Sequence, residues 1–146
     1  MAERTVFQSI PKRVILSLSS HATVWEAACA MTRANFSSVL VMDPPDRLLG
    51  IVTERDLTTR VLARALDPKT TTLAQVMTPN PLCVTPQTKV SDAVLMMIER
   101  GFRHLPIVGP DRKVMGVFSV RDALPREIGT AFSQAEFNEQ VNDVLG

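Results

Sequence analysis

Residues 50–56 read Gly-Ile-Val-Thr-Glu-Arg-Asp, and residues 116–122 repeat the pattern as Gly-Val-Phe-Ser-Val-Arg-Asp. In each stretch an apolar, strand-like run ends at a hydroxyl residue, and a carboxylate follows three residues later. A hydroxyl at the helix N-cap with an acid at the third helical position is typical of a helix start. Both stretches therefore predict a strand that turns into a helix. We call them the first corner (Thr53 to Asp56) and the second corner (Ser119 to Asp122).

The two corners belong to an internal repeat with a constant offset of 66 residues and no gap. A register held over some forty residues indicates duplication of one structural unit. The identical pairs include Leu16/Leu82, Val24/Val90, Ala27/Ala93, Met31/Met97, Phe36/Phe102, Pro44/Pro110, Gly50/Gly116, Arg55/Arg121 and Asp56/Asp122.

Each copy predicts the element order β-α-β-β-α. A short strand near 14–18 or 82–85 precedes a helix that begins at Thr23 or Thr88, and apolar residues recur in it at helical spacing. Thr23 and Glu26 fit a capping box, and Gly101 would end the second helix in a left-handed conformation. Two strands joined by a Pro- and Asp-containing turn then lead into the corner. A unit of this kind leaves one sheet face uncovered, so two copies should pack together in an α+β fold.

These patterns divide the chain into four predicted segments. They are a first repeat with an N-terminal arm (1–66), a connection (67–81) with a possible short helix at 73–77, a second repeat (82–128) and a C-terminal helix (129–146). In the last segment Ser133 and Glu136 fit a capping box after Gly129. Phe137, Val141 and Leu145 form an apolar stripe, which would pack either on its own domain or on a partner or dimer.

Composition narrows the class of protein. The 146 residues are 45% hydrophobic with a net charge of +1, which describes a soluble globular protein with no general attraction to nucleic acid or membranes. No apolar run approaches the ~18 residues of a membrane span, and the N-terminus lacks a signal-like apolar region, so we expect a cytoplasmic protein. Cys29 and Cys83 form no metal-ligand motif and are interpreted as buried thiols, a disulfide being the alternative.

The corners, the paired units and two further phrases together resemble the CBS domain family, specifically a stand-alone tandem CBS pair, or Bateman module. The phrases are Gln75 to Thr78 and Arg103 to Val108, and the resemblance covers about residues 10 to 128. It implies two repeats related by pseudo-twofold symmetry with clefts between them. Such modules bind adenosine-containing ligands, including AMP, ADP, ATP, NAD and S-adenosylmethionine, and often form homodimers. The resemblance implies a regulatory role in signal transduction and no catalytic cofactor, with an unidentified regulated protein as a possible partner.

The hydroxyl and carboxylate of a corner allow two interpretations. They can act only as a helix cap, whose acid also suits the positive end of the helix dipole. Alternatively, they can bind a ribose, because a carboxylate can accept hydrogen bonds from both hydroxyls of the 2′,3′-diol. The duplication and the family resemblance favour ribose binding in at least one cleft, through Thr53 and Asp56 or through Ser119 and Asp122.

By resemblance, each cleft joins one corner to segments of the other copy. The first corner would meet the backbone of 77–82 and residues 102–104, and the second would meet 10–16 and 36–38. Here Pro11-Lys12-Arg13 stands where the other copy has Met77-Thr78-Pro79, so Lys12 and Arg13 could instead meet phosphate. The predicted base-binding walls are Met77, Thr78, Leu82, Phe102, Leu16, Phe36, Ser37, Ser38, Ile51 and Val117. The phosphate candidates are Arg103, His104, Arg55, Arg121, Lys12 and Arg13, with Arg60 also considered.

Enzymatic function is not expected. Neither His21 nor His104 has the Cys, Asp or Glu spacing of a zinc site, and no nucleophile–base pair is visible. The leading hypothesis is a regulatory module whose adenosyl ligand changes the arrangement of the repeats or of a dimer. The alternative is a ligand-free dimerisation or scaffold module whose corners serve only as helix caps. A third, less favoured hypothesis is a small enzyme or redox switch that uses Cys29 or Cys83.

Overall fold

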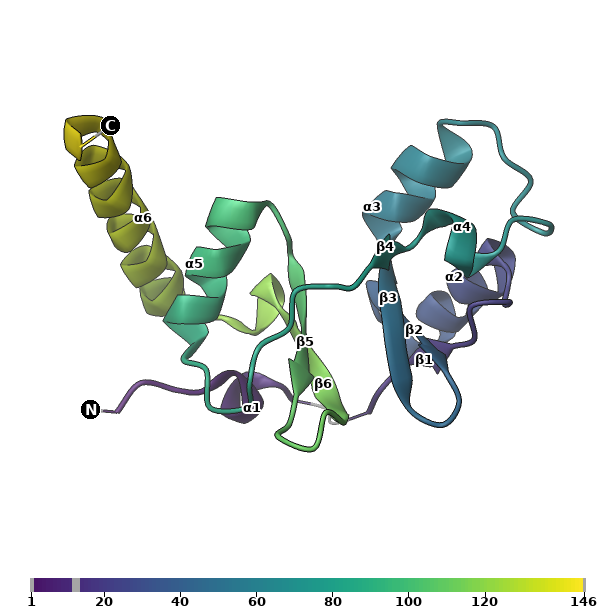
Figure 1. Cartoon of the computed structure of the whole chain (residues 1–146), viewed down its shortest axis with the longest axis horizontal. Helices are drawn as coiled ribbons and strands as arrows, with labels where there is room; N and C mark the ends of the chain where they lie inside the picture. The colour runs from purple at the N-terminus through teal and green to yellow at the C-terminus, as the bar shows by residue number, and fades with distance from the viewer. Residues whose placement is uncertain (1, 12–13, 146) are drawn as a thin grey trace. The chain divides into compact units, whose positions relative to one another are not determined.

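The computed structural model describes residues 2–11 and 14–145, which form two compact units (Figure 1). The repeat-one unit is Val14–Pro81. The repeat-two unit combines Leu82–Gly146 with the N-terminal arm, Met1–Arg13. The arm therefore packs with the second copy and the connecting segment packs with the first. Each unit has its own apolar core, and each is described separately below.

The repeat-one unit is a four-stranded sheet with helices. The sheet order is β1-β2-β3-β4, with β1 parallel to β2 and the other neighbours antiparallel. Val39, Val41 and Val52 on the sheet join Val24 and Ala27 on α2 in the core. The elements are β1 (Ser17–Leu18), α2 (Val24–Ala34), β2 (Ser38–Asp43), β3 (Arg47–Thr53), α3 (Glu54–Asp56), the π-helical η1 (Leu57–Leu62), α4 (Leu73–Val76) and β4 (Thr78–Pro79).

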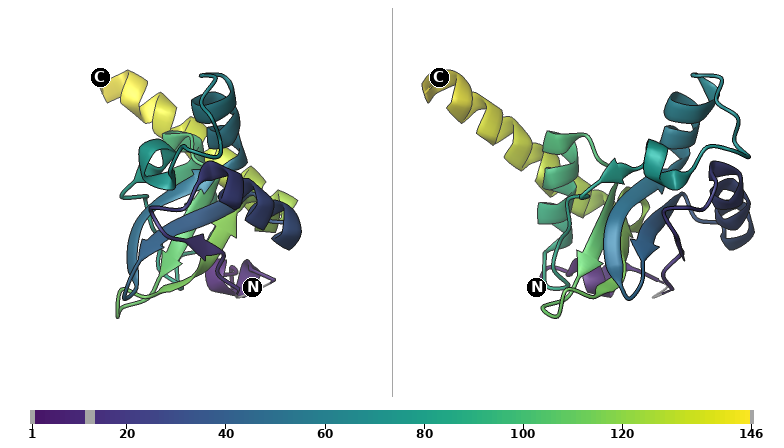
Figure 2. Two further views of the ribbon diagram at one scale, coloured as in Figure 1. Left: turned by 90° about the vertical axis from the view of Figure 1, so that its right-hand side faces the viewer. Right: turned by 45° about the vertical axis from the view of Figure 1, so that its right-hand side comes forward.

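The repeat-two unit has an antiparallel pair of strands, β5 and β6, with Val84 bridged in parallel to Ile107 of β5. Phe118, Leu105 and Ile107 on these strands are fully buried. The two views of Figure 2 show α6 running beside α5 and extending past it. The elements are α1 (Val6–Ser9), α5 (Val90–Arg100), β5 (His104–Val108), β6 (Val114–Ser119), the 3-10 turn η2 (Val120–Asp122) and α6 (Pro125–Leu145).

Most of the predicted elements are present, but the strand expected near 82–85 appears only as the single bridge of Val84 to Ile107. Thr23 caps α2 with a reciprocal bond to Glu26, and Gly101 ends α5 at φ = 77°. Copy two differs at its helix start, because α5 begins after Lys89 instead of at Thr88. Thr88 instead accepts a hydrogen bond from the backbone N–H of Thr85.

A second set of equivalent segments precedes each copy. Thr5 and Gln8 form a capping box at α1, and Thr72 and Gln75 form the same box at α4. The offset here is 67 residues, one more than elsewhere. Because of this shift, Ile10 occupies in one unit the place that Met77 occupies in the other. Both residues contact the glycine of their corner strand.

The two corner glycines make close contacts of different kinds. A Cβ on Gly50 would lie 2.5 Å from the Sδ of Met77 and 2.8 Å from the carbonyl oxygen of Thr78. A Cβ on Gly116 would lie 2.7 Å from the Cδ1 of Ile10, the flexible end of a side chain. The contact at Gly50 therefore includes backbone that belongs to the β3–β4 ladder, while the contact at Gly116 does not.

Helix α6 begins at Pro125, four residues before the predicted segment, and Ser133 lies inside the helix rather than at its cap. Proline suits a first helical position because it has no N–H to leave unpaired. The Glu127 carboxylate accepts the N–H of Leu124 at 2.7 Å, which supplies the start signal that the predicted Ser133 box was expected to give.

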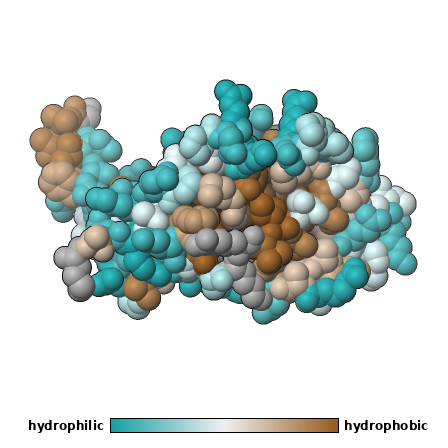
Figure 3. Space-filling model, turned by 90° about the horizontal axis from the view of Figure 1, so that it is seen from below, coloured by the Kyte–Doolittle hydropathy of each residue, from teal (hydrophilic) through white to brown (hydrophobic). Residues whose placement is uncertain are grey.

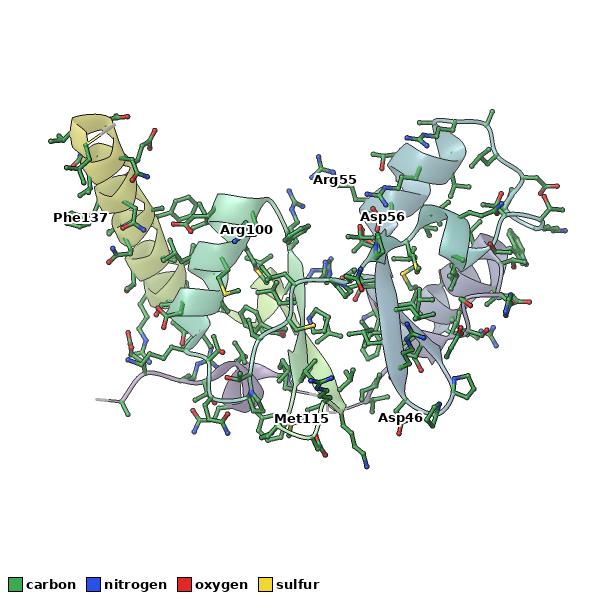
Figure 4. All side chains as sticks on the ribbon, viewed as in Figure 1. Asp46, Arg55, Asp56, Arg100, Met115 and Phe137 are labelled. Atoms are coloured by element: carbon green, nitrogen blue, oxygen red, sulfur yellow. The ribbon has the colours of Figure 1, made fainter. Side chains whose placement is uncertain are left out.

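The face of α6 that meets α5 is not the predicted apolar stripe. Ala131 is buried, and Asn138 donates to Glu99 of α5 at 3.1 Å. Phe137 and Leu145 are 59% and 80% exposed, and Figure 4 shows Phe137 pointing away from α5. The end of α6 carries apolar surface in Figure 3. Val141, the middle residue of the stripe, is half-buried. Packing of Phe137 and Leu145 on their own domain is therefore wrong, and contact of the stripe with a partner stays a prediction.

One ion pair joins the N-terminal arm to the start of α6. The Nε and Nη2 of Arg4 donate to the two oxygens of Glu127 at 3.1 and 2.7 Å. The side chain of Glu127 is 8% exposed and that of Arg4 is 29% exposed. The Arg4 hydrogen bond is the main reason that the pKa of Glu127 is lowered, and the N–H of Leu124 adds to the effect.

Alanine at the corner glycines should have unequal effects. We expect Gly50→Ala to lower the free energy of unfolding by about 1–3 kcal/mol, because backbone must move to admit the methyl group. Gly116→Ala should lower it less, since Ile10 can change its rotamer. Urea unfolding measures both. Gly129→Ala is the control, because no atom lies within 4 Å of its Cβ and alanine favours a helix interior, so it should not destabilise. Equal losses at Gly50 and Gly116 would contradict the contact geometry.

The Arg4–Glu127 pair should make the free energy of unfolding depend on pH. The pKa of Glu127 in the folded chain lies below its ordinary value of 4.5, so the stabilisation is present above that pH and is lost as the pH falls through the folded pKa. We expect Glu127→Gln to lower the free energy of unfolding by about 1–3 kcal/mol at pH 7. This difference from wild type should shrink as the pH is lowered to 3, as followed by urea unfolding. A difference that stays constant with pH would contradict the assignment.

Candidate functional site

The first corner is a closed exchange of hydrogen bonds at the end of β3. The N–H of Thr53 donates to the Oδ2 of Asp56 at 2.9 Å, and the N–H of Asp56 donates to the Oγ1 of Thr53 at 3.3 Å. Arg60 approaches the Oδ1 of Asp56 at 3.6 Å and donates to the carbonyl of Val76 at 2.9 Å. Both corner side chains are half-buried, so they are anchored and still reach solvent.

The second corner repeats this exchange at the end of β6. The N–H of Ser119 donates to the Oδ2 of Asp122 at 2.9 Å, and the N–H of Arg121 donates to the Oγ of Ser119 at 3.4 Å. Burial raises the pKa of Asp122, while the Ser119 N–H and the charge of Arg4 oppose the rise. The side chains of both corners therefore do cap their helices, as one interpretation of the sequence predicted.

The helices that follow the corners differ. In the repeat-one unit α3 continues directly into η1, so the chain is helical from Glu54 to Leu62. In the repeat-two unit the helix ends after one turn, because Ala123 is extended at φ = −83° and ψ = 145°. Helix α6 then starts separately at Pro125. The first corner is thus followed by a continuous helix, whereas the second is followed by a single helical turn and a break.

Several predicted base-binding residues lie next to the first corner. In the sheet, Ser38 pairs with Thr53 and Thr78 pairs with Ile51. The carbonyl of Ser37 accepts the N–H of Glu54 at 3.1 Å. Their closeness follows from the hairpin and from β4 lying at the edge of the same sheet.

The second corner is bordered in the same way within its own unit. His104 pairs with Ser119, Pro106 pairs with Val117, and the carbonyl of Arg103 accepts the N–H of Val120 at 3.2 Å. The sequence grouped 36–38 with the second corner and 102–104 with the first. Within each unit these segments lie beside the corner of their own copy.

The other predicted residues are more peripheral to the corners. Leu16 and Leu82 are partly buried against the cores of their own units. Phe36 is half-buried and Phe102 is 39% exposed. Arg55, Arg103 and Arg121 are exposed, which suits contact with a phosphate, and Figure 4 shows Arg55 extending from α3 next to Asp56. Lys12 and Arg13 lie outside the described residues.

Two residues near the second corner were missed by the reasoning from sequence. The Nη2 of Arg4 donates to the backbone carbonyl of Asp122 at 3.0 Å while the same guanidinium holds Glu127. No local pattern connects residues that lie 118 and 123 positions apart. The available local signal was the Thr5–Gln8 box, which matches the Thr72–Gln75 box and so marks the arm as the counterpart of the α4 segment, without indicating which unit it packs with.

Neither metal nor membrane features were found in the part of the chain that the structure describes. In residues 2–11 and 14–145 no three His, Cys, Asp or Glu side chains are grouped to hold a metal ion. No described helix is both long and apolar enough to pass through a bilayer. Cys29 and Cys83 are thiols, and burial raises the pKa of Cys83, which disfavours the reactive thiolate.

Comparison with known proteins agrees with this architecture. The meiotically up-regulated gene 70 protein of Schizosaccharomyces pombe is 34% identical over 139 residues, which cover 89% of this chain and 19% of that protein. An uncharacterized 17.7 kDa protein of Acidianus ambivalens is 35% identical over 118 residues, or 81% of this chain and 70% of that one. The chain thus spans about a fifth of the first relative's length and most of the second's.

A solved structure and a family model complete the comparison. The CBS domain protein PAE2072 of Pyrobaculum aerophilum, complexed with AMP, matches with a TM-score of 0.78 at 26% identity, over 90% of this chain and 100% of that one. The model of the CBS domain matches twice, at residues 7–63 and 73–127. These two matches cover both corners and most of the chain, which therefore belongs to the CBS domain family as a tandem pair.

Proposed function

We propose that this chain is a regulatory CBS pair that binds an adenosine-containing ligand through the carboxylates of its corners. The observation that carries the proposal is the duplicated pairing of a hydroxyl with a half-buried carboxylate at a strand end, at Asp56 and again at Asp122. The AMP bound by the related PAE2072 supports the choice of ligand class. AMP, ADP, ATP, NAD and S-adenosylmethionine all present the ribose that this chemistry requires.

The geometry leaves acceptor capacity for a ribose. Only the Oδ2 of each carboxylate is used by the cap at 2.9 Å, and a carboxylate has about four lone-pair sites. At the first corner, Arg60 approaches Oδ1 at 3.6 Å, which is too long for a strong hydrogen bond. A 2′,3′-diol can therefore add two hydrogen bonds to a side chain that the cap already orients.

The surroundings of the corners supply the remaining contacts of the proposal. The half-buried Val117 offers apolar surface to the base at the second corner, while Ile51 at the first corner is only 6% exposed. Backbone groups of 77–79 and of 10–11 are the proposed hydrogen-bond partners of the base. The exposed Arg55, Arg103 and Arg121 would meet phosphate. We favour the first corner as the stronger site, because its helix is continuous from Glu54 to Leu62.

Regulation requires that ligand binding favour one arrangement of the protein over another. We propose that a homodimer or a regulated protein reads this change. The alternative function, a ligand-free dimerisation or scaffold module, is favoured by one observation, namely that both corners already act as complete helix caps. The two functions differ in whether an adenosyl compound binds.

The capping role predicts a loss of stability in the absence of ligand. We expect Thr53→Ala to lower the free energy of unfolding by about 1 kcal/mol, because the N–H of Asp56 loses its acceptor. Thr53→Ser keeps the hydroxyl and is the matched control. Urea unfolding of ligand-free protein compares the three. If Thr53→Ala were as stable as wild type, the hydroxyl would not be a cap.

The ribose role predicts that the corner carboxylates determine AMP affinity. By isothermal titration calorimetry we expect Asp56→Asn to weaken AMP binding by about 10- to 100-fold, the equivalent of one charge-assisted hydrogen bond. Asp122→Asn should do the same for a second site if both corners are occupied. Asp46→Asn, in the exposed β2–β3 loop shown in Figure 4, is the control and should bind as wild type.

Two results would contradict the proposal in different ways. If neither Asp56→Asn nor Asp122→Asn weakens AMP binding, the ribose lies elsewhere. If wild-type protein shows no thermal shift with AMP, ADP, ATP, NAD or S-adenosylmethionine, the scaffold function is supported instead. A ligand at 100 times its Kd adds about 2.7 kcal/mol to stability, so an adenosyl ligand should be readily detected.

A further inference from the structure

The N-terminal arm reaches the second corner through the side chain of Arg4. Its guanidinium donates to the carbonyl of Asp122 at 3.0 Å and to both oxygens of Glu127 at 3.1 and 2.7 Å. Asp122 is the last residue of η2, and Glu127 lies in the first turn of α6. One planar group therefore bridges the corner and the start of the next helix, where the chain itself is not helical.

The backbone of Arg4 is held as firmly as its side chain. Its carbonyl accepts the N–H of Val90 at 3.0 Å, and the N–H of Val6 donates to the carbonyl of Thr88 at 2.8 Å. Thr5 also pairs with Lys89 in an antiparallel bridge. Arg4 is thus anchored to the start of α5, so a shift of the corner relative to α5 must stretch the contacts of Arg4.

The repeat-one unit shows what stands at this place when no ion pair is present. The carbonyl of Thr71 accepts the N–H of Val24 at 2.9 Å, as that of Arg4 accepts Val90, so Thr71 is the counterpart of Arg4. The counterpart of Glu127, 66 residues earlier, is Val61, which is 5% exposed. Repeat one therefore has a hydroxyl residue and a valine at the sequence positions that match Arg4 and Glu127, and its helix runs on without the break at Ala123.

The ion pair is consequently specific to the repeat-two unit and not a feature that both repeats share. Taking two charges out of water is costly, and an apolar pair at such a place is often as stable. What the repeat-two unit has and the repeat-one unit lacks is a break between corner and helix, at Ala123. The ion pair spans this break. The positive charge of Arg4 also acts on the Asp122 carboxylate, where it opposes the effect of burial on the pKa.

We propose that Arg4 is a positioning residue of the second corner, and that its ion pair with Glu127 transmits occupancy of the Asp122 site to helix α6. This inference rests on the proposed binding of an adenosyl ligand. A ligand on the Asp122 carboxylate holds η2 in one position, Arg4 holds the Asp122 carbonyl and Glu127 together, and the first turns of α6 are thereby steadied. The coupling is reciprocal, so a change that loosens the start of α6 also lowers the affinity for the ligand.

The test uses the full chain with Asp56→Asn as background, so that AMP reports on the second corner. Calorimetry gives the AMP affinity, and hydrogen–deuterium exchange follows residues 120–132 with and without AMP. In this background we expect AMP to slow exchange at the start of α6. With Arg4→Gln added, AMP should bind about 5- to 150-fold more weakly and should no longer slow exchange in α6.

Four further variants separate positioning from general stability. Glu3→Gln removes the exposed ion pair of Glu3 with Lys89 in the same arm, at 3.1 Å, and should change neither readout. Glu127→Gln should lower the affinity for AMP as Arg4→Gln does. The variant with both substitutions should lose no more affinity than either single variant, because the two residues act as a unit. Arg4→Lys keeps the positive charge but cannot bond Asp122 and both oxygens of Glu127 in the same way. Its loss of AMP affinity should therefore be smaller than that of Arg4→Gln.

The outcomes distinguish this inference from the function on which it rests. If AMP binds the Asp56→Asn protein and Arg4→Gln changes neither its affinity nor its effect on α6, the positioning role is overturned while the proposed function stands. If AMP binds wild type but not the Asp56→Asn protein, the second corner is not an AMP site and the inference is overturned. If AMP does not bind wild type at all, the proposed function fails and the inference falls with it.

Discussion

At the end of β3 the N–H of Thr53 donates to the carboxylate of Asp56, whose own N–H returns a hydrogen bond to the Thr53 hydroxyl. Each unit depends on an exchange of this kind, because it is where an antiparallel strand must stop and a helix must begin. The exchange leaves a carboxylate half-buried and oriented at the surface. The group that ends the strand is therefore also the group that the proposed ligand would contact.

The two corners have the same local chemistry and different support. The first is continued by helix and bordered by β4, whose pairing brings Thr78 beside Ile51. The second is followed by an extended residue, Ala123, and is supported from a distance by Arg4. Duplication has thus produced two carboxylates with the same capping geometry whose connections to the rest of the protein are unlike. If both corners bind a ligand as proposed, binding at one corner affects the rest of the protein differently from binding at the other.

Much of the fold was predictable because its determinants are local. The capping box at Thr23, the left-handed Gly101 and the two hairpins are set by residues close in sequence, and each is present. The start of α6 was not predictable from Gly129 and Ser133. Pro125 and the hydrogen bond from the N–H of Leu124 to Glu127 begin the helix earlier, and the Ser133 pattern has no effect inside a helix.

The two corners were identified from the repeat itself. The support given by Arg4 could not be, because contacts over more than a hundred residues leave no local pattern, and a one-residue change of offset hid the equivalence of Ile10 and Met77.

The assignment of the N-terminal arm to the repeat-two unit has a consequence for the order in which the protein is made. The repeat-one unit is an unbroken stretch, Val14–Pro81, and can close as soon as that stretch has left the ribosome. The arm is synthesised before it, yet its partners at Thr88 and Val90, at Gly116 and at Glu127 come much later. Closing so large a loop is entropically costly, so these contacts are among the slowest to form. The arm thus precedes most of its partners in the chain by more than eighty residues, and it is among the last segments of the repeat-two unit to pack.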